Sequence, residues 1–340
     1  MAQGVALVVT AGVAWGGTWW IRHYALRRAL IDVPNHRSSH VHPTPRGGGV
    51  AIVAAWVGCL IWVGWQSGPV VPWAAVTAAC VVAVVGFMDD HQSLSAWLRL
   101  GAHLSAGVVM VWSIGGWPLG AGWEWAGAVV GIWVVAWWIN LTNFMDGIDG
   151  LAALHVITVC LGGVACLVAG GVGVADVRLI PGLALAAASL GFLVWNWPPA
   201  RIFMGDAGSG FLGAAVAACL LQAGQVAPAL GWAWALLSGT FVVDATVTLA
   251  LRVLRREPLF EAHRTHAYQR LTRHLRGHRP VTVLWSAVTV VWLWPWALGV
   301  ARGAVDGRIA MAAAWGPLVL VVLAVARWAP GDWRGPNDVA

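Results

Sequence analysis

Long apolar stretches recur along the whole chain, and they limit its fold more than any other feature. Each is about 18 to 20 residues long, which is the length of an α-helix that crosses the roughly 30 Å hydrocarbon core of a bilayer. Eleven such stretches can be drawn, at 4–23, 47–66, 70–88, 98–114, 125–144, 151–170, 177–195, 209–226, 229–251, 280–300 and 309–328. The sequence therefore predicts an all-α, polytopic membrane protein with about eleven transmembrane helices.

The composition agrees with a protein that lies mostly in lipid. Of the 340 residues, 59% are hydrophobic and 10% are charged, whereas soluble domains carry about 25% charged residues. No tandem repeat or low-complexity tract interrupts the pattern. We therefore expect one transmembrane domain over 1–328, followed by a short cytoplasmic tail at 329–340.

The arginines predict the orientation in the membrane. No positive charge precedes the first apolar segment, so we expect a retained helix that starts outside rather than a cleaved signal peptide. With the N-terminus outside, seventeen arginines lie on the inner side and three on the outer side. An arginine excess marks the cytoplasmic side of a membrane protein, and this asymmetry supports the orientation.

Polar residues gather in five loops that this orientation places on the cytoplasmic side. The loops are DVPNHRSSHVHPTPRGGG (32–49), GFMDDHQSL (86–94), NLTNFMDGIDGLA (140–152), NWPPARIFMGDAGSGFLG (196–213) and EAHRTHAYQRL (261–271). They hold seven of the fourteen acids, namely Asp32, Asp89, Asp90, Asp146, Asp149, Asp206 and Glu261. Because all five loops face one side, we predict that they form a single site.

Each loop alone also has a structural explanation. Asp149 could cap the helix that follows it, the acids of FMDD could end a helix in water, and His263 and His266 could be interfacial residues. Helix packing or a tight turn could explain the glycines of GDAGSG, which are Gly205, Gly208 and Gly210.

Taken together, the loops favour phosphoryl chemistry. Several carboxylates on one face repel one another unless a cation neutralises them, and magnesium prefers carboxylate and phosphate oxygens. The glycines beside Asp206 allow backbone N–H groups to approach an anion. Arg37, Arg46 and Arg264 supply positive charge for phosphate oxygens. We therefore predict a metal-dependent site for a diphosphate.

Four motifs in this order, GFMDD, NLTNFMDGIDGLA, FMGDAGSGFLG and HRTHAYQRL, make the chain resemble a known family. It is similar to the polyprenyl-phosphate N-acetylhexosamine-1-phosphate transferases, or glycosyltransferase family 4. The resemblance spans roughly residues 32 to 271. It implies transfer of a sugar 1-phosphate from a UDP-sugar to undecaprenyl phosphate with release of UMP. It also implies dependence on Mg²⁺, for which Mn²⁺ can substitute, and a place in the bacterial inner membrane.

The resemblance also implies roles for single residues. Asp206 matches the magnesium ligand, with Asp90 as a second ligand, and Phe203 matches an aromatic side chain that stacks on uracil. Asn143 and Asp149 match positions at the nucleotide site.

Further roles concern the reacting phosphates. Asp89 and Asp90 match an aspartate pair whose first member is proposed to act on the lipid phosphate, and Asp146 lies beside the nucleotide positions. His263 and His266 match the histidine motif of a loop, and we expect them to bind phosphate rather than metal.

Two departures separate this chain from the peptidoglycan enzyme of the same family, phospho-N-acetylmuramoyl-pentapeptide transferase. That enzyme carries a run of histidines where HRTH stands here, and its early loop lacks RSSH…PTPRGGG. Both features are more similar to the branch that begins O-antigen and related surface polysaccharides, so we expect a HexNAc donor. Arg264 and 38–40 lie in these loops and are assigned to the sugar. The peptidoglycan reaction remains an alternative.

An ion-coupled secondary transporter is the alternative from another class. It requires acids near the bilayer midplane and an internal repeat, and only Asp244 lies inside an apolar stretch of this kind. The expected partners are the UDP-sugar, the polyprenyl phosphate and the lipid bilayer, without nucleic acid. The sequence leaves a homodimer open.

Overall fold

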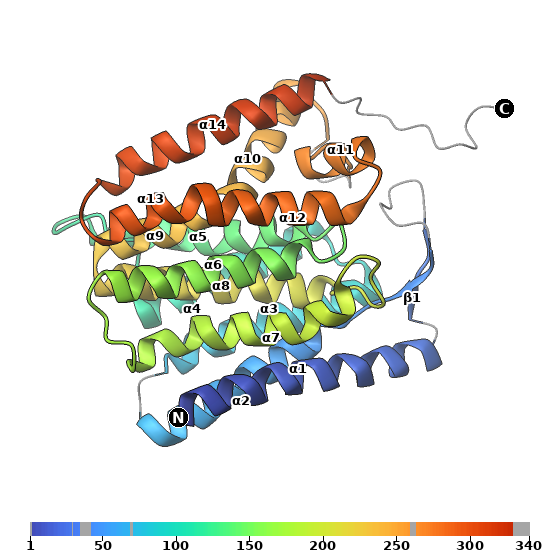
Figure 1. Ribbon diagram of the computed structural model, residues 1–340, viewed down its shortest axis with the longest axis horizontal. Helices are drawn as coiled ribbons and strands as arrows, with labels where there is room; N and C mark the ends of the chain where they lie inside the picture. The colour runs from blue at the N-terminus through green and yellow to red at the C-terminus, as the bar shows by residue number, and fades with distance from the viewer. Residues whose placement is uncertain (1, 29, 35–41, 69–70, 259–262, 329–340) are drawn as a thin grey trace.

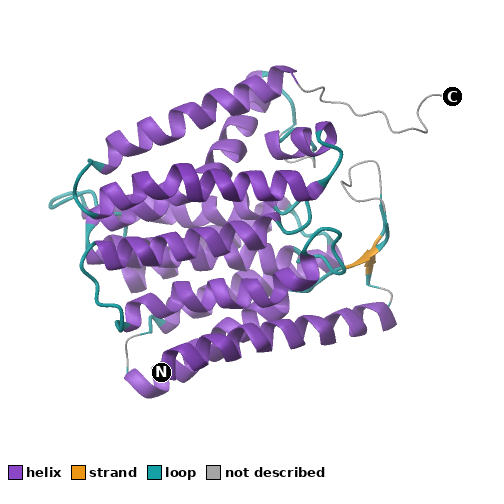
Figure 2. Ribbon diagram, viewed as in Figure 1, coloured by secondary structure: helices purple, strands orange, loops and turns teal. Residues whose placement is uncertain are grey.

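The computed structural model describes residues 2–28, 30–34, 42–68, 71–258 and 263–328. Arg37, the 38–40 stretch and the tail predicted at 329–340 lie outside the described residues. Nearly all of the described chain is helical, as Figure 2 shows, and the helices run roughly parallel to one another across the molecule. The predicted all-α class is confirmed.

The first half of the chain forms six long helices and one small strand pair (Figure 1). The helices are α1 (Ala2–Arg27), α2 (Gly49–Ser67), α3 (Trp73–Gln92), α4 (Ala96–Ile114), α5 (Glu124–Met145) and α6 (Leu151–Ala169). Strands β1 (Ile31–Asp32) and β2 (Thr44–Pro45) pair antiparallel between α1 and α2, with Asp32 opposite Thr44.

The second half adds shorter and broken helices. After a 3₁₀ turn (Val177–Leu179) come α7 (Ile180–Asn196), α8 (Asp206–Val226), α9 (Pro228–Leu237), α10 (Gly239–Leu254) and α11 (Ala267–His274). The last long spans are α12 (His278–Val288), continued through a π-helical segment (Thr289–Leu293) into α13 (Trp294–Ala301), and α14 (Gly307–Trp328).

The number of membrane-spanning segments agrees with the sequence. In the described chain, ten helical segments are long and apolar enough to cross a membrane, and the bent pair α9–α10 makes eleven. The protein is therefore a polytopic membrane protein.

One predicted helix, 229–251, is wrong as a single rod. It bends by 68° between α9 and α10. The Trp138 indole donates to the Ser238 hydroxyl at the bend (3.2 Å), and the Trp315 indole donates to the Leu236 carbonyl (3.2 Å). A side chain at Gly239 would collide with Trp315. An indole of a neighbouring helix thus satisfies the Leu236 carbonyl near the bend, and such bonds make a bend tolerable within an apolar bundle.

Helix α8 lies at the centre of the bundle. It is the most buried of the candidate spans, whereas α1 and α4 are among the least buried. It packs against α2, α3, α5 and α9. Gly208 on α8 lies so close to Gly49 on α2 that a side chain at either position would clash. The packing explanation of this glycine is therefore confirmed, and it brings the start of α8 beside the loops that follow β2 and α3.

Candidate functional site

Three loops meet at the N-terminus of α8, and we call this region the acidic end. It comprises 86–95 at the end of α3, 143–150 at the end of α5 and 196–206 before α8. Gly205 caps α8 with a positive φ of 77°, which is a backbone conformation that glycine adopts without strain. A side chain at Gly205 would lie 2.7 Å from the Asp90 carboxylate, and one at Gly86 would run into the Asp206 backbone. These two glycines therefore allow α3 to approach the start of α8.

Asp90 is buried and bonded to the helix start itself. Its Oδ1 accepts the Asp206 backbone N–H (3.1 Å) and its Oδ2 accepts that of Ala207 (3.3 Å). The sequence had suggested these N–H groups for a substrate anion, but the Asp90 carboxylate takes them in this structure. A carboxylate at a helix N-terminus is stabilised by the helix dipole. The arrangement thus ties α3 to α8.

Asp89 is paired with a cation of the protein. Its Oδ2 lies 2.7 Å from Nη1 of Arg99, and its Oδ1 accepts the Leu94 backbone N–H (2.6 Å). Its carboxyl group also lies near Asp206, as does the Asn143 side chain. Asn143 Nδ2 in addition donates to the Ser209 hydroxyl on α8 (3.1 Å). Asn143, Asp89 and Asp206 are therefore brought together, as the motifs predicted.

Asp149 connects three elements rather than capping α6. Its Oδ2 accepts the Ala200 backbone N–H (3.0 Å), and its Oδ1 lies 3.1 Å from Nδ1 of His278 at the start of α12. The N-cap residue of α6 is Gly150, with φ 74°, whose N–H donates to Asn196 Oδ1 (2.8 Å). The capping explanation for Asp149 is therefore wrong. This aspartate holds the 196–206 loop against α12.

Asp146 differs from the other acids of the acidic end. No hydrogen-bond donor or cation of the described chain contacts its carboxyl group. Its burial raises its pKa well above the ordinary value, and the carboxylates of Asp206, Asp90 and Asp149 raise the pKa further. Loss of hydration and like-charge repulsion both disfavour the ionised form. A cation would relieve both costs.

The donor set fits a magnesium ion that binds together with its substrate. Within the described residues, no group of three His, Cys, Asp or Glu side chains is arranged to hold a metal ion alone. Mg²⁺ commonly takes one or two protein carboxylates and completes its shell with water and substrate phosphates. Asp206 and Asp146, next to Asp90, provide such a partial set.

Phe203 and Arg46 reach the acidic end through the strand pair. The Phe203 backbone N–H donates to the Pro45 carbonyl (2.8 Å), and its carbonyl accepts the Gly48 N–H (3.0 Å). The Arg46 guanidinium donates to the Asp90 backbone carbonyl. The segment after β2 therefore runs beside the 196–206 loop. It carries Arg46 to the edge of the acidic end.

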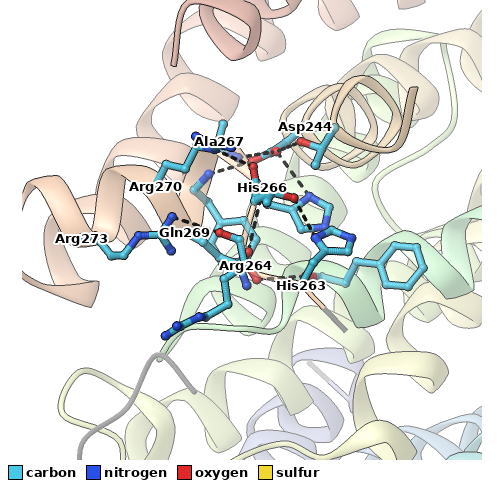
Figure 3. A network of polar contacts seen from close by, with 12 residues as sticks. Asp244, His263, Arg264, His266, Ala267, Gln269, Arg270 and Arg273 are labelled. Atoms are coloured by element: carbon cyan, nitrogen blue, oxygen red, sulfur yellow. Dashed lines mark hydrogen bonds and ion pairs between the residues drawn. The ribbon is translucent and has the colours of Figure 1, made fainter. Parts of the chain in front are cut away.

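The two predicted histidines have different surroundings (Figure 3). His266 is 2% exposed, and its Nδ1 lies 3.5 Å from Asp244 Oδ1. His263 is partly buried, its Nδ1 contacts the Thr265 hydroxyl (2.9 Å), and its ring stacks on His266 with centroids 4.9 Å apart. Burial, together with the nearby His266 and Arg252, lowers the pKa of His263 to about 3. His263 is therefore neutral at pH 7 and can bind a phosphate oxygen through one N–H.

Arg264, between the two histidines, accepts a hydrogen bond on its carbonyl from the Arg273 guanidinium (3.0 Å). The structure also places residues at the site that the sequence analysis did not assign to it. They are Arg99, Asn196, Asp244, Tyr268 and His278. Asp244 carried a signal, because a lone acid inside an apolar stretch needs a partner, and its partners turn out to be backbone groups of α11. His278 carried no signal, because a histidine at a helix start is common in basic loops.

Comparison with known proteins agrees with the motifs. Residues 72–224 match the family described as glycosyl transferase family 4. The decaprenyl-phosphate N-acetylglucosaminephosphotransferase of Mycolicibacterium smegmatis is 29% identical over 331 residues, which cover 84% of this chain and 78% of that protein. The enzyme of the same name from Mycobacterium leprae is 30% identical over 313 residues, covering 79% and 75%. The phospho-N-acetylmuramoyl-pentapeptide-transferase of Lacticaseibacillus paracasei is 32% identical over 235 residues, covering 62% and 69%.

Proposed function

This chain belongs to the polyprenyl-phosphate N-acetylhexosamine-1-phosphate transferases of glycosyltransferase family 4, and on this premise we propose that it transfers N-acetylglucosamine 1-phosphate from UDP-N-acetylglucosamine to a polyprenyl phosphate. The products are the polyprenyl diphospho-sugar and UMP. The observation that carries the proposal is the meeting of Asp206, Asp146 and Asp90 at the start of α8, where the described chain offers Asp146 no cation. Such a group of acids is suited to a metal-bound diphosphate.

In the reaction, an oxygen of the acceptor phosphate attacks the β-phosphorus of the UDP-sugar. A new P–O bond forms, the bond between the β-phosphorus and the bridging oxygen breaks, and UMP leaves with that oxygen. The acceptor phosphate is already an anion near neutral pH, so the site has to position the reactants and neutralise charge more than remove a proton.

We propose that Asp206 and Asp146 hold magnesium together with the diphosphate, with Asp90 beside them. The bound metal would neutralise charge on the diphosphate and on the UMP leaving group. Asp90 keeps free lone pairs after accepting two backbone N–H groups, so the earlier assignment of Asp90 as a metal ligand stays a prediction.

The remaining residues are proposed to bind and orient the two substrates. Phe203, Asn143 and Asp149 would form the uridine side. Arg46 and His263 would contact phosphate oxygens. Asp89, held by Arg99, would orient the lipid phosphate at the bilayer surface. The loops of the acidic end would then face the cytoplasm of a bacterial inner membrane, where UDP-sugars are found.

The donor and the acceptor both follow from the names of the relatives and are open to a direct test. Two relatives are named for N-acetylglucosamine and decaprenyl phosphate, while the motifs resemble the surface-polysaccharide branch that uses undecaprenyl phosphate. We therefore place the reaction at the first membrane step of a cell-surface polysaccharide. A relative named for the pentapeptide reaction keeps that donor in the test.

Purified protein in detergent would be given Mg²⁺ and one of four donors, namely UDP-N-acetylglucosamine, UDP-N-acetylfucosamine, UDP-N-acetylquinovosamine or UDP-MurNAc-pentapeptide. Each donor would be paired with undecaprenyl or decaprenyl phosphate, and mass spectrometry would identify the lipid product. We expect UDP-N-acetylglucosamine to react and the pentapeptide donor to fail. A parallel preparation of Asp206→Asn controls for contaminating host enzymes. Product from the pentapeptide donor alone would assign the protein to peptidoglycan synthesis instead.

A further inference from the structure

A buried aspartate in α10 holds the start of α11 (Figure 3). Asp244 is 0% exposed, its Oδ1 accepts the Ala267 backbone N–H (2.8 Å), and its Oδ2 accepts that of Tyr268 (2.9 Å). The Thr248 hydroxyl donates to the same carboxylate (3.2 Å). Two bonds from the first turn of a helix to one carboxylate are charge-assisted and fix both its position and its direction. Asp244 therefore sets where α11 begins.

The second connection runs from α11 to the acidic end. The Tyr268 hydroxyl donates to the Phe144 carbonyl (2.9 Å), two residues before Asp146. Gly147 lies directly against the same hydroxyl, so a side chain at that position would clash. Burial raises the pKa of Tyr268 well above its ordinary value, and the hydroxyl therefore remains a donor at any pH used for an assay. We call the Asp244 and Tyr268 contacts together the latch.

Side chains of α11 form hydrogen bonds with the backbone of the histidine segment 263–266. Gln269 Oε1 accepts the His266 N–H (3.3 Å), and the Arg270 guanidinium donates to the Thr265 carbonyl (2.9 Å). His266 packs between the Tyr268 ring and the His263 ring, with centroids 5.8 Å and 4.9 Å away. The position of His263 relative to Asp146 is therefore set by the latch.

We infer that Asp244 and Tyr268 are positioning residues for the transfer reaction, because they hold the histidine segment at one place beside the Asp146 loop. Their role in transfer rests on the proposed function, whereas the contacts that Asp244 and Tyr268 make do not depend on it. Neither residue touches the predicted uridine side, which is formed by Asn143, Asp149 and Phe203. Loosening the latch should therefore disturb alignment and leave nucleotide binding nearly unchanged.

The test uses Tyr268→Phe, which removes one hydroxyl and keeps the ring. Since a small misplacement in an active site lowers turnover strongly, we expect kcat to fall roughly tenfold while KM for the UDP-sugar changes by less than about twofold. The chain offers a matched control, because its other tyrosine, Tyr24, is exposed on α1. Tyr24→Phe should keep the wild-type kcat. Wild-type kcat in Tyr268→Phe, or a loss of activity that only follows a loss of folded protein, would overturn the inference.

Asp244→Asn tests the contacts between Asp244 and the start of α11, because an amide has only one acceptor oxygen for the two N–H groups. Hydrogen exchange followed by mass spectrometry should show the amides of 267–268 exchanging roughly tenfold faster in this variant. In the double variant with Tyr268→Phe, the loss in kcat should be smaller than the product of the two single losses, since residues that act as one unit are not additive. Unchanged exchange together with multiplicative losses would contradict the latch.

The two proposals fail in different ways. Absence of transfer by the wild-type protein, with every donor and acceptor, would overturn the proposed function. The exchange measurement does not depend on catalysis and would still decide whether Asp244 holds α11.

Discussion

The two aspartate pairs of the acidic end have the same composition but different surroundings. At the end of α3, both acids have partners in the protein, because Asp89 pairs with Arg99 and Asp90 accepts two N–H groups of α8. In the loop after α5, Asp149 has His278 and a backbone N–H, while Asp146 has neither a donor nor a cation among the described residues. The difference separates three acids that hold segments in place from Asp146, which has no such partner and which we propose as a ligand of the metal.

The largest effect is expected at the acids that we propose as metal ligands, Asp206 and Asp146. In Asp206→Asn, a carboxylate that we assign to magnesium is lost, and metal ions supply several kcal/mol of transition-state stabilisation. We therefore expect kcat for UMP release to fall roughly 10²- to 10⁴-fold, and EDTA to abolish wild-type activity. Asp176→Asn, in the exposed loop before α7, is the matched control and should keep wild-type turnover. Normal turnover by Asp206→Asn, or full activity in EDTA, would remove the metal role.

Asp146→Asn should lower activity and yet stabilise the metal-free protein. The folded-state pKa of Asp146 lies well above the ordinary 3.8, so the folded state binds this proton more tightly than the unfolded state. Stability is then lost as the pH rises from about 4 through the folded-state pKa. An asparagine does not ionise and avoids that loss, so we expect the variant to have a Tm higher by roughly 2–4 °C at pH 8 in EDTA.

The measurement is a thermal unfolding series of both proteins in detergent at pH 5 and pH 8. The gain should be larger at pH 8, and added Mg²⁺ with UDP should stabilise the wild type more than the variant. Asp176→Asn again serves as the control, because Arg178 lowers the pKa of Asp176 to about 2. Folding therefore favours the ionised form of Asp176, and this variant should not gain stability at pH 8. Equal Tm values for wild type and Asp146→Asn at both pH values would show that ionisation of Asp146 does not destabilise the folded protein.

The smallest of the three effects concerns the held pair. Arg99→Gln leaves the Asp89 carboxylate beside Asp206 without its cation, and loss of one partner of a hydrogen-bonded charge pair costs about 1–3 kcal/mol. We expect kcat to fall roughly tenfold, less than in Asp206→Asn. Arg178→Gln breaks an ion pair of the same kind with Asp176 in an exposed loop and should have no effect on turnover. A loss in Arg99→Gln as large as in Asp206→Asn would place Asp89 among the metal ligands.

Much of the architecture could be read from the chain. Apolar stretches with bilayer length predict membrane helices whatever surrounds them, because backbone groups in lipid must be satisfied within the helix. The motifs likewise predicted which loops carry the acids, and Asn143, Asp89 and Asp206 do lie together. The bend at Ser238 could not be predicted, because it depends on indole groups of Trp138 and Trp315, which come from two other helices.

Residue types and their order along the chain were sufficient for the membrane class, the number of spans, the segments that carry the acids and the family. These properties follow from local hydropathy and from motifs whose residues are close in sequence. The partner of each acid depended on the packed structure. Asp90 meets the start of α8 across 116 positions, and Asp149 meets His278 across 129. The partner of a carboxylate depends on distance and burial in three dimensions, and aspartates that look alike in sequence therefore have different partners in the folded protein.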